Sequence, residues 1–109
     1  MQEGMLPETD ADLDGWIASR PFALTVFTTP DCGVCNAIRP QLDALPREFP
    51  GLKVRYVDTN ANPALAAAHS VFTVPVLELS VHGKLASRFV RHFSMDEVRA
   101  SLSRYAAFV

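Results

Sequence analysis

Two cysteines are the side chains of this sequence best suited to chemistry, and two residues separate them in the segment Cys32-Gly33-Val34-Cys35. The segment follows an apolar run and opens a predicted helix. The N–H groups and partial positive charge at a helix N-terminus stabilise a thiolate on Cys32, and one helical turn brings the two sulfurs within bonding distance. A thiolate attacks a disulfide, and a second thiol then displaces the product. The pattern therefore predicts thiol–disulfide exchange, with Cys32 as the nucleophile and Cys35 as the resolving thiol.

Two alternative interpretations do not involve redox chemistry: the cysteines could be an inert pair of core residues, or one half of a metal site. A structural zinc ion would need two further ligands. The other side chains that could bind zinc are those of His69, His82 and His92. They fall on different predicted elements, without the spacing of zinc ligands. We therefore expect no metal, while the inert pair stays open as an alternative. Gly33 suits the close approach of a partner's backbone.

A second motif is Thr73-Val74-Pro75-Val76, in which a proline opens a predicted strand. Proline has no N–H to give to a sheet, so the first position of a strand suits it. If the Val74–Pro75 peptide bond is cis, it leaves the backbone of Val74 free to pair with an extended peptide. An ordinary trans proline at the start of a strand is the alternative.

The hydrophobic pattern predicts the elements that must position these motifs. Strands are expected at 22–27, 53–58, 76–81 and 85–90, and helices are expected to begin at Thr9 or Asp10, at or just after Cys32, at Asn62 and at Ser94. Pro40 lies inside the second helix and is expected to bend it. This order of elements describes a βαβ unit with a parallel strand pair, followed by a hairpin and a closing helix.

The strand patterns differ in their expected burial. Residues 22–27 are apolar on both faces, which is typical of a central strand covered by helices on each side. Residues 76–81 alternate apolar side chains with Glu78 and Ser80, which predicts one wetter face. His82-Gly83 is expected to form the tight turn of the hairpin. In the second helix the expected buried positions are Ile38, Leu42, Leu45 and Phe49.

Composition limits the class of protein. The chain has 109 residues, 49% hydrophobic and 20% charged, with a formal net charge of −2. These values are typical of a single globular domain over residues 1–109, and residues 1–8 are expected to be a loosely ordered arm. The charge gives no basic field for nucleic acid or a membrane surface. The chain starts without the features of a signal peptide, so a cytoplasmic protein is expected. The pattern shows no obvious exposed apolar stripe, so a monomer is expected.

Taken together, these features resemble the thioredoxin family over most of the chain, from about Thr9 to Tyr105. The resemblance rests on the apolar strand before the Cys-Gly-Val-Cys segment, on Pro40, on Val57-Asp58, on Val74-Pro75, on Gly83-Lys84 and on the capped last helix. It implies an α/β fold, a thioredoxin-like three-layer sandwich with a mixed central sheet of about four strands and helices on both faces.

The family resemblance also implies a site and partners. Pro75 would be cis and lie against the cysteines, and substrate would contact Val74, Pro75 and the intervening Gly33 and Val34. The implied activity is reduction of protein disulfides, with electrons from a thioredoxin reductase and with no cofactor bound to this chain. A binding module for an extended peptide, with slow cysteines, is the alternative function.

Four positions depart from the family pattern. Asp31 stands where tryptophan is usual, and Val34 stands where proline is usual. Val26 replaces a buried aspartate that assists proton transfer, and Arg91 replaces a glycine that keeps the substrate groove open. A negative charge at Asp31 would disfavour the Cys32 thiolate, and Arg91 would either narrow the groove or offset Asp31. A glutathione-binding relative is less expected, since the chain lacks a Gly-Gly-x-Asp segment after the hairpin.

Overall fold

The computed structural model describes residues 9–109. The expected arm over residues 1–8 lies outside the described residues. The described chain forms a four-stranded sheet in the order β2-β1-β3-β4. Its strands are β1 (Phe22–Thr28), β2 (Lys53–Asp58), β3 (Val76–Val81) and β4 (Lys84–Val90).

The sheet is mixed, as the sequence predicts. β1 pairs in parallel with β2, and it pairs antiparallel with β3, which in turn pairs antiparallel with β4. All seven residues of β1 are buried, which confirms the prediction of a central strand. The β3–β4 turn is at His82 and Gly83, with φ values of 49° and 82°. Positive φ at both turn residues is the geometry of a two-residue hairpin loop, so this prediction is also confirmed.

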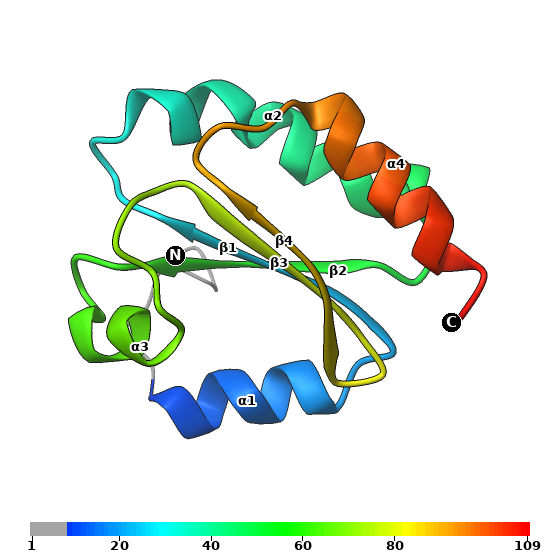
Figure 1. Ribbon diagram of the computed structural model, residues 1–109, viewed down its shortest axis with the longest axis horizontal. Helices are drawn as coiled ribbons and strands as arrows, with labels where there is room; N and C mark the ends of the chain where they lie inside the picture. The colour runs from blue at the N-terminus through cyan, green and yellow to red at the C-terminus, as the bar shows by residue number, and fades with distance from the viewer. Residues whose placement is uncertain (1–8) are drawn as a thin grey trace.

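In the described part of the chain four helices cover the sheet: α1 (Asp10–Ala18), α2 (Gly33–Glu48), α3 (Pro63–Ala68) and α4 (Met95–Ala106). Helices α2 and α4 lie on one face, and α1 and α3 lie on the other (Figure 1). Side chains start three of these helices by accepting hydrogen bonds from free backbone N–H groups. The caps are Thr9 on α1, Cys32 on α2 and Ser94 on α4.

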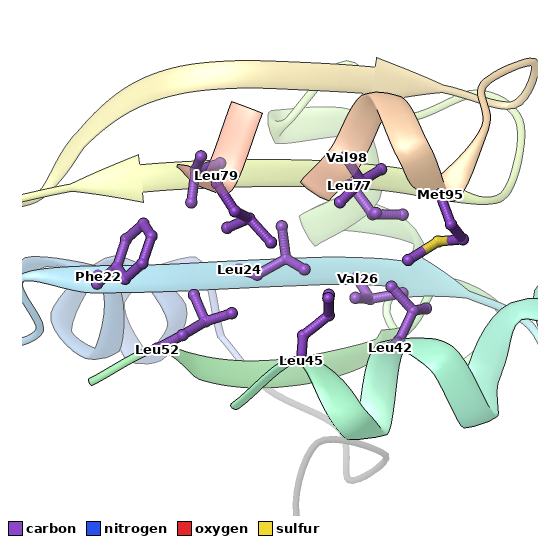
Figure 2. Close-up of a cluster of buried hydrophobic side chains, with 11 residues drawn as sticks. Phe22, Leu24, Val26, Leu42, Leu45, Leu52, Leu77, Leu79, Met95 and Val98 are labelled. Atoms are coloured by element: carbon purple, nitrogen blue, oxygen red, sulfur yellow. The ribbon is translucent and has the colours of Figure 1, made fainter. Parts of the chain in front are cut away.

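Each face of the sheet has its own hydrophobic core. Side chains of β1 and β3 pack against α2 and α4 in the larger core (Figure 2). There Leu42 and Leu45 are buried, whereas Ile38 and Phe49 are only partly buried against the cluster. The smaller core joins α1 and α3 to the opposite face, with Trp16 partly buried against it. Within the described residues, no helix is long and apolar enough to cross a membrane.

The expected wetter face of β3 is wrong. Glu78 is only 7% exposed and Ser80 only 3% exposed. β3 lies inside the sheet between β1 and β4, and helices pack on both faces of the sheet, α2 and α4 on one and α1 and α3 on the other. Glu78 is accommodated there because its two carboxylate oxygens are bonded to His69 and Arg88. A charged residue in an alternating pattern therefore marked a buried ion pair in this strand.

Candidate active site

The cysteine pair lies where β1 ends and α2 begins. Cys32 is the N-cap of α2, and its Sγ accepts a hydrogen bond from the backbone N–H of Cys35 at 3.1 Å. The two residues form a disulfide, with their Cα atoms 5.2 Å apart. The expected placement of the motif at the start of a helix is therefore confirmed.

The two cysteine residues differ in their access to solvent. Cys35 is 4% exposed and belongs to the buried residues of the chain, whereas Cys32 is only partly buried. Gly33 and Val34 are exposed between them, and a Cβ added at Gly33 would meet no atom within 4 Å. A partner molecule can therefore approach the pair from the side of Cys32 and the intervening residues.

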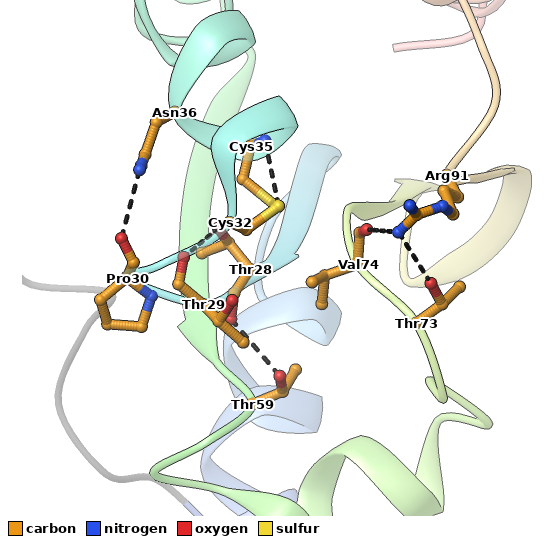
Figure 3. The surroundings of a disulfide bond; sticks show 10 residues. All are labelled: Thr28, Thr29, Pro30, Cys32, Cys35, Asn36, Thr59, Thr73, Val74 and Arg91. Atoms are coloured by element: carbon orange, nitrogen blue, oxygen red, sulfur yellow. Dashed lines mark hydrogen bonds between the residues drawn. A yellow bond between two sulfur atoms is a disulfide. The ribbon is translucent and has the colours of Figure 1, made fainter.

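Backbone hydrogen bonds hold the loop before Cys32 in place. The Cys32 N–H donates to the Thr29 carbonyl at 3.3 Å, and the side-chain amide of Asn36 donates to the Pro30 carbonyl at 3.2 Å (Figure 3). The Thr59 N–H donates to the Thr28 carbonyl at 2.9 Å, which ties the end of β1 to the loop after β2. The cysteines are thus presented on a supported turn at the end of the central strand β1.

The second motif lies beside this turn. The Val74–Pro75 peptide bond is cis, as expected from the family resemblance. The sheet places it there because Val76 pairs with Phe27, so the residues before Val76 lie next to those after Phe27. Pro75 is buried and Val74 is partly buried. Figure 3 shows Val74 between the disulfide and Arg91.

Arg91 follows β4 directly, and its side chain reaches the Val74–Pro75 segment. Its φ is 52°, a left-handed conformation that is uncommon for residues other than glycine. The Arg91 N–H donates to the Pro75 carbonyl at 2.8 Å. Its guanidinium donates from one nitrogen to the Val74 carbonyl at 3.3 Å and to Thr73 Oγ1 at 3.5 Å (Figure 3). The sequence did not predict these contacts.

A groove continues from Val74 on the side of α3. It has a volume of about 330 Å³ and runs between Thr29, Thr59 and the segment before β3. Phe72, also in its lining, is 84% exposed. No sequence signal marks Phe72 as part of a site, since an isolated phenylalanine before a strand is usually a core residue.

Two of the departures from the family pattern have clear environments. Val26 is 1% exposed within the larger hydrophobic core, so no acid stands at the position of the family's buried aspartate. Asp31 is exposed on the turn before Cys32. Within residues 9–109, Arg91 has no carboxylate partner, so it does not form an ion pair with Asp31.

A cluster around His69 lies away from the cysteines and was not predicted. The His69 ring contacts Glu78 at 3.0 Å, Asp10 at 3.3 Å and Asp14 at 3.8 Å. Of the residues that the structure describes, Asp10, Asp14 and His69 are the one group of three placed closely enough to hold a metal ion. Neither cysteine belongs to this group.

Comparisons with known proteins agree with this geometry. The family described as Thioredoxin matches residues 5–104. The thioredoxin-like protein YdfQ of Bacillus subtilis is 30% identical over 92 residues, which cover 84% of this chain and 82% of that protein. A thioredoxin of Staphylococcus aureus is 31% identical over 83 residues, covering 75% of this chain and 79% of that protein.

Solved structures of thioredoxins have a similar fold. A mutant thioredoxin from Halobacterium salinarum has a TM-score of 0.81 at 25% identity, with 94% of this chain and 89% of that chain covered. Fasciola hepatica thioredoxin has a TM-score of 0.77 at 29% identity, with 86% and 91% covered. A fold of this kind with a Cys-x-x-Cys pair supports thiol–disulfide oxidoreductase activity. From its sequence match, its sheet and its cysteine pair, the chain belongs to the thioredoxin family.

Proposed function

We propose that this protein reduces disulfide bonds in protein substrates, with Cys32 as the attacking thiol and Cys35 as the resolving thiol. The observation that carries the proposal is the unequal exposure of the pair at the start of α2. Cys32 is the residue that a substrate can reach, and it stands at the N-terminus of a helix, where a thiolate is stabilised. Cys35 is buried behind it, one helical turn away.

The exchange balances over two steps. The Cys32 thiolate attacks one sulfur of the substrate disulfide, so a Cys32–substrate bond forms and the other substrate sulfur leaves as a thiolate. The Cys35 thiol then gives up its proton, attacks Cys32 Sγ and releases the second substrate sulfur as a thiol. Two electrons pass to the substrate, and the protein ends as the Cys32–Cys35 disulfide seen in the structure.

The substrate would lie along the Val74–Pro75 segment, with Gly33 and Val34 on its other side. Extended peptides bind to sheet edges by pairing their main-chain groups with a free backbone edge. Val74 provides such an edge immediately before β3 and beside the disulfide. A dithiol donor must return the two electrons, and family membership favours a thioredoxin reductase. We further propose that the chain acts as one domain, as a monomer and in the cytoplasm.

Single-cysteine variants test the proposed roles. The reduced Cys35→Ser variant should form a stable mixed disulfide with a disulfide-linked peptide, because the thiol that resolves the intermediate is gone. The matched Cys32→Ser variant should form none, since its remaining thiol is buried. Mass spectrometry under non-reducing conditions would show the adduct as the mass of the protein plus one peptide.

The same assay separates reduction from the alternative function, a binding module with slow cysteines. A binding module would hold the peptide without forming the covalent adduct in either variant. An adduct on Cys32→Ser alone would reverse the assigned roles. Absence of the adduct on Cys35→Ser would contradict the proposed function.

A further inference from the structure

We propose that Arg91 selects substrates, favouring disulfides whose cysteine is flanked by an acidic residue in an extended segment. This inference rests on the proposed function and concerns the same site. It starts from the position of the Arg91 guanidinium, which is bonded to the carbonyl of Val74. That carbonyl belongs to the backbone edge along which the substrate peptide would pair.

The side chain is held loosely enough to serve an incoming group. Its two hydrogen bonds, of 3.3 Å and 3.5 Å, lie beyond the usual N–H···O range of about 2.7–3.2 Å. Both come from one nitrogen, whereas a guanidinium carries five N–H donors. The side chain is exposed, so the remaining donors face solvent at the substrate edge.

Within residues 9–109, Arg91 has no partner of opposite charge. Arg88 is paired with Glu78 and Arg99 with Glu48, at 3.1 Å and 2.8 Å. Within the described part of the chain, no carboxylate is paired with Arg91. An acid on the substrate would supply the missing partner, and a guanidinium accepts a carboxylate through two parallel hydrogen bonds.

The backbone places Arg91 beside the segment that the substrate would contact. Arg91 has a φ of 52°, and its N–H is bonded to the Pro75 carbonyl at 2.8 Å. These features place its Cα at the end of β4, directly beside the Val74–Pro75 segment. A left-handed backbone at a residue other than glycine costs energy, and strain of this kind clusters at functional sites.

A peptide need not displace Arg91 to bind. A carbonyl oxygen has two lone pairs, so the Val74 carbonyl can accept from Arg91 and from a peptide N–H together. The guanidinium then lies beside the bound segment and contacts the side chains flanking the substrate cysteine. A glutamate or aspartate there gains a charge-assisted hydrogen bond, whereas a lysine meets a like charge.

The test uses three symmetric disulfide dimers of one short peptide, in which the residues flanking the cysteine are Glu, Gln or Lys. A compensating charge at the far end keeps the net charge of the three peptides equal. Pre-reduced protein is mixed with each dimer, and the second-order rate constant is read from the peptide thiol released in a single turnover. The proteins are wild type, Arg91→Gln, Arg91→Lys and the control Arg104→Gln, an exposed arginine on α4.

We expect wild type to reduce the Glu peptide about threefold faster than the Gln peptide, and the Lys peptide more slowly still. The preference should shrink at high salt, disappear in Arg91→Gln, persist in part in Arg91→Lys, and stay intact in Arg104→Gln. Equal rates for all three peptides with wild type would overturn the inference while leaving the proposed function standing. A preference that survives in Arg91→Gln would also overturn it. If wild type reduces none of the peptides, the proposed function itself fails.

Discussion

Cys32 is flanked by two unlike charges on neighbouring loops. Asp31 precedes it directly and is exposed, while Arg91 lies beyond Val74 on the other side of the substrate edge. Within the described residues, neither Asp31 nor Arg91 forms an ion pair. The N-terminus of α2 favours the Cys32 thiolate and the Asp31 carboxylate opposes it, so the reactivity of this cysteine reflects a balance of local fields.

Replacing Asp31 with asparagine should raise the reactivity of Cys32. Two exposed unit charges about 6 Å apart in water repel by about 0.7 kcal/mol, which corresponds to a factor of about three in the thiolate fraction. The rate of alkylation of the reduced protein by iodoacetamide, measured as a function of pH, reports that fraction. Asp31→Asn should therefore react about threefold faster than wild type at pH values where most of the thiol is still protonated.

Asp14→Asn is the matched control, because Asp14 is an exposed acid on α1, on the opposite face of the sheet. Its alkylation profile should overlay that of wild type. If Asp31→Asn also overlays wild type, the carboxylate has no electrostatic effect on the nucleophile.

The residues of the site were predictable to different degrees. The cysteine motif and Pro75 carry local chemical signals, so their positions at a helix start and a strand start could be read from the sequence. The reach of Arg91 to Val74 could not, because it depends on a left-handed backbone at the end of β4 and on the pairing of β3 with β4. Neither feature leaves a periodic pattern.

At the scale of elements, local patterns predicted the strands and helices well where one rule dominated. The uninterrupted apolar run of β1 indicated its central place, and His82-Gly83 indicated the turn between β3 and β4. Alternation failed for β3, because Glu78 looked like a solvent-facing residue. Its partners, His69 and Arg88, come from the end of α3 and from β4, and such long-range pairs are not visible in a local pattern.

Two glycines should respond in opposite ways to alanine substitution. Gly15 lies within α1, where an added Cβ would meet no atom within 4 Å, so Gly15→Ala should stabilise the protein by about 1 kcal/mol through helix propensity. Gly83 has a φ of 82°, and its added Cβ would lie 3.5 Å from Ala18 Cα. Gly83→Ala should therefore destabilise it by about 1–2 kcal/mol.

Urea denaturation of the oxidised proteins measures both effects as differences in the free energy of unfolding. The two variants control for each other, since each adds one methyl group on or beside α1. Loss of stability in Gly15→Ala, or none in Gly83→Ala, would contradict the backbone conformations described for these positions.

At the scale of the whole molecule, the His69 cluster joins distant parts of the chain on the face opposite to α2 and α4. The ring of His69 lies beside Phe27 and bonds to Glu78 through Nδ1 at 3.0 Å, and Nε2 faces Asp10 and Asp14 of α1. The guanidinium of Arg88 bonds to Glu78 and also to the His69 carbonyl. Three acids and one cation therefore surround the ring, and the side chain of His69 is only 15% exposed.

This environment should make stability depend on pH. The hydrogen bond to Glu78 raises the pKa of His69 above its usual value of 6.5, and the charges of Glu78 and Asp10 act in the same direction, against the opposing effect of burial. A histidine whose folded-state pKa is raised contributes stability that is fully present below the unfolded pKa and is lost as the pH rises through the folded pKa. The cluster should therefore stabilise the protein more at pH 5.5 than at pH 8.5.

The measurement is the free energy of unfolding of wild type and His69→Gln at these two pH values, since a small domain that unfolds in one step reports such linkage directly. Wild type should exceed His69→Gln by more at pH 5.5 than at pH 8.5. His92→Gln is the matched control substitution, because the exposed His92 lies outside the cluster. A difference for His69→Gln that stays constant or grows with pH would mean that the protonated ring does not stabilise the fold. A constant difference would leave the cluster a role in packing alone.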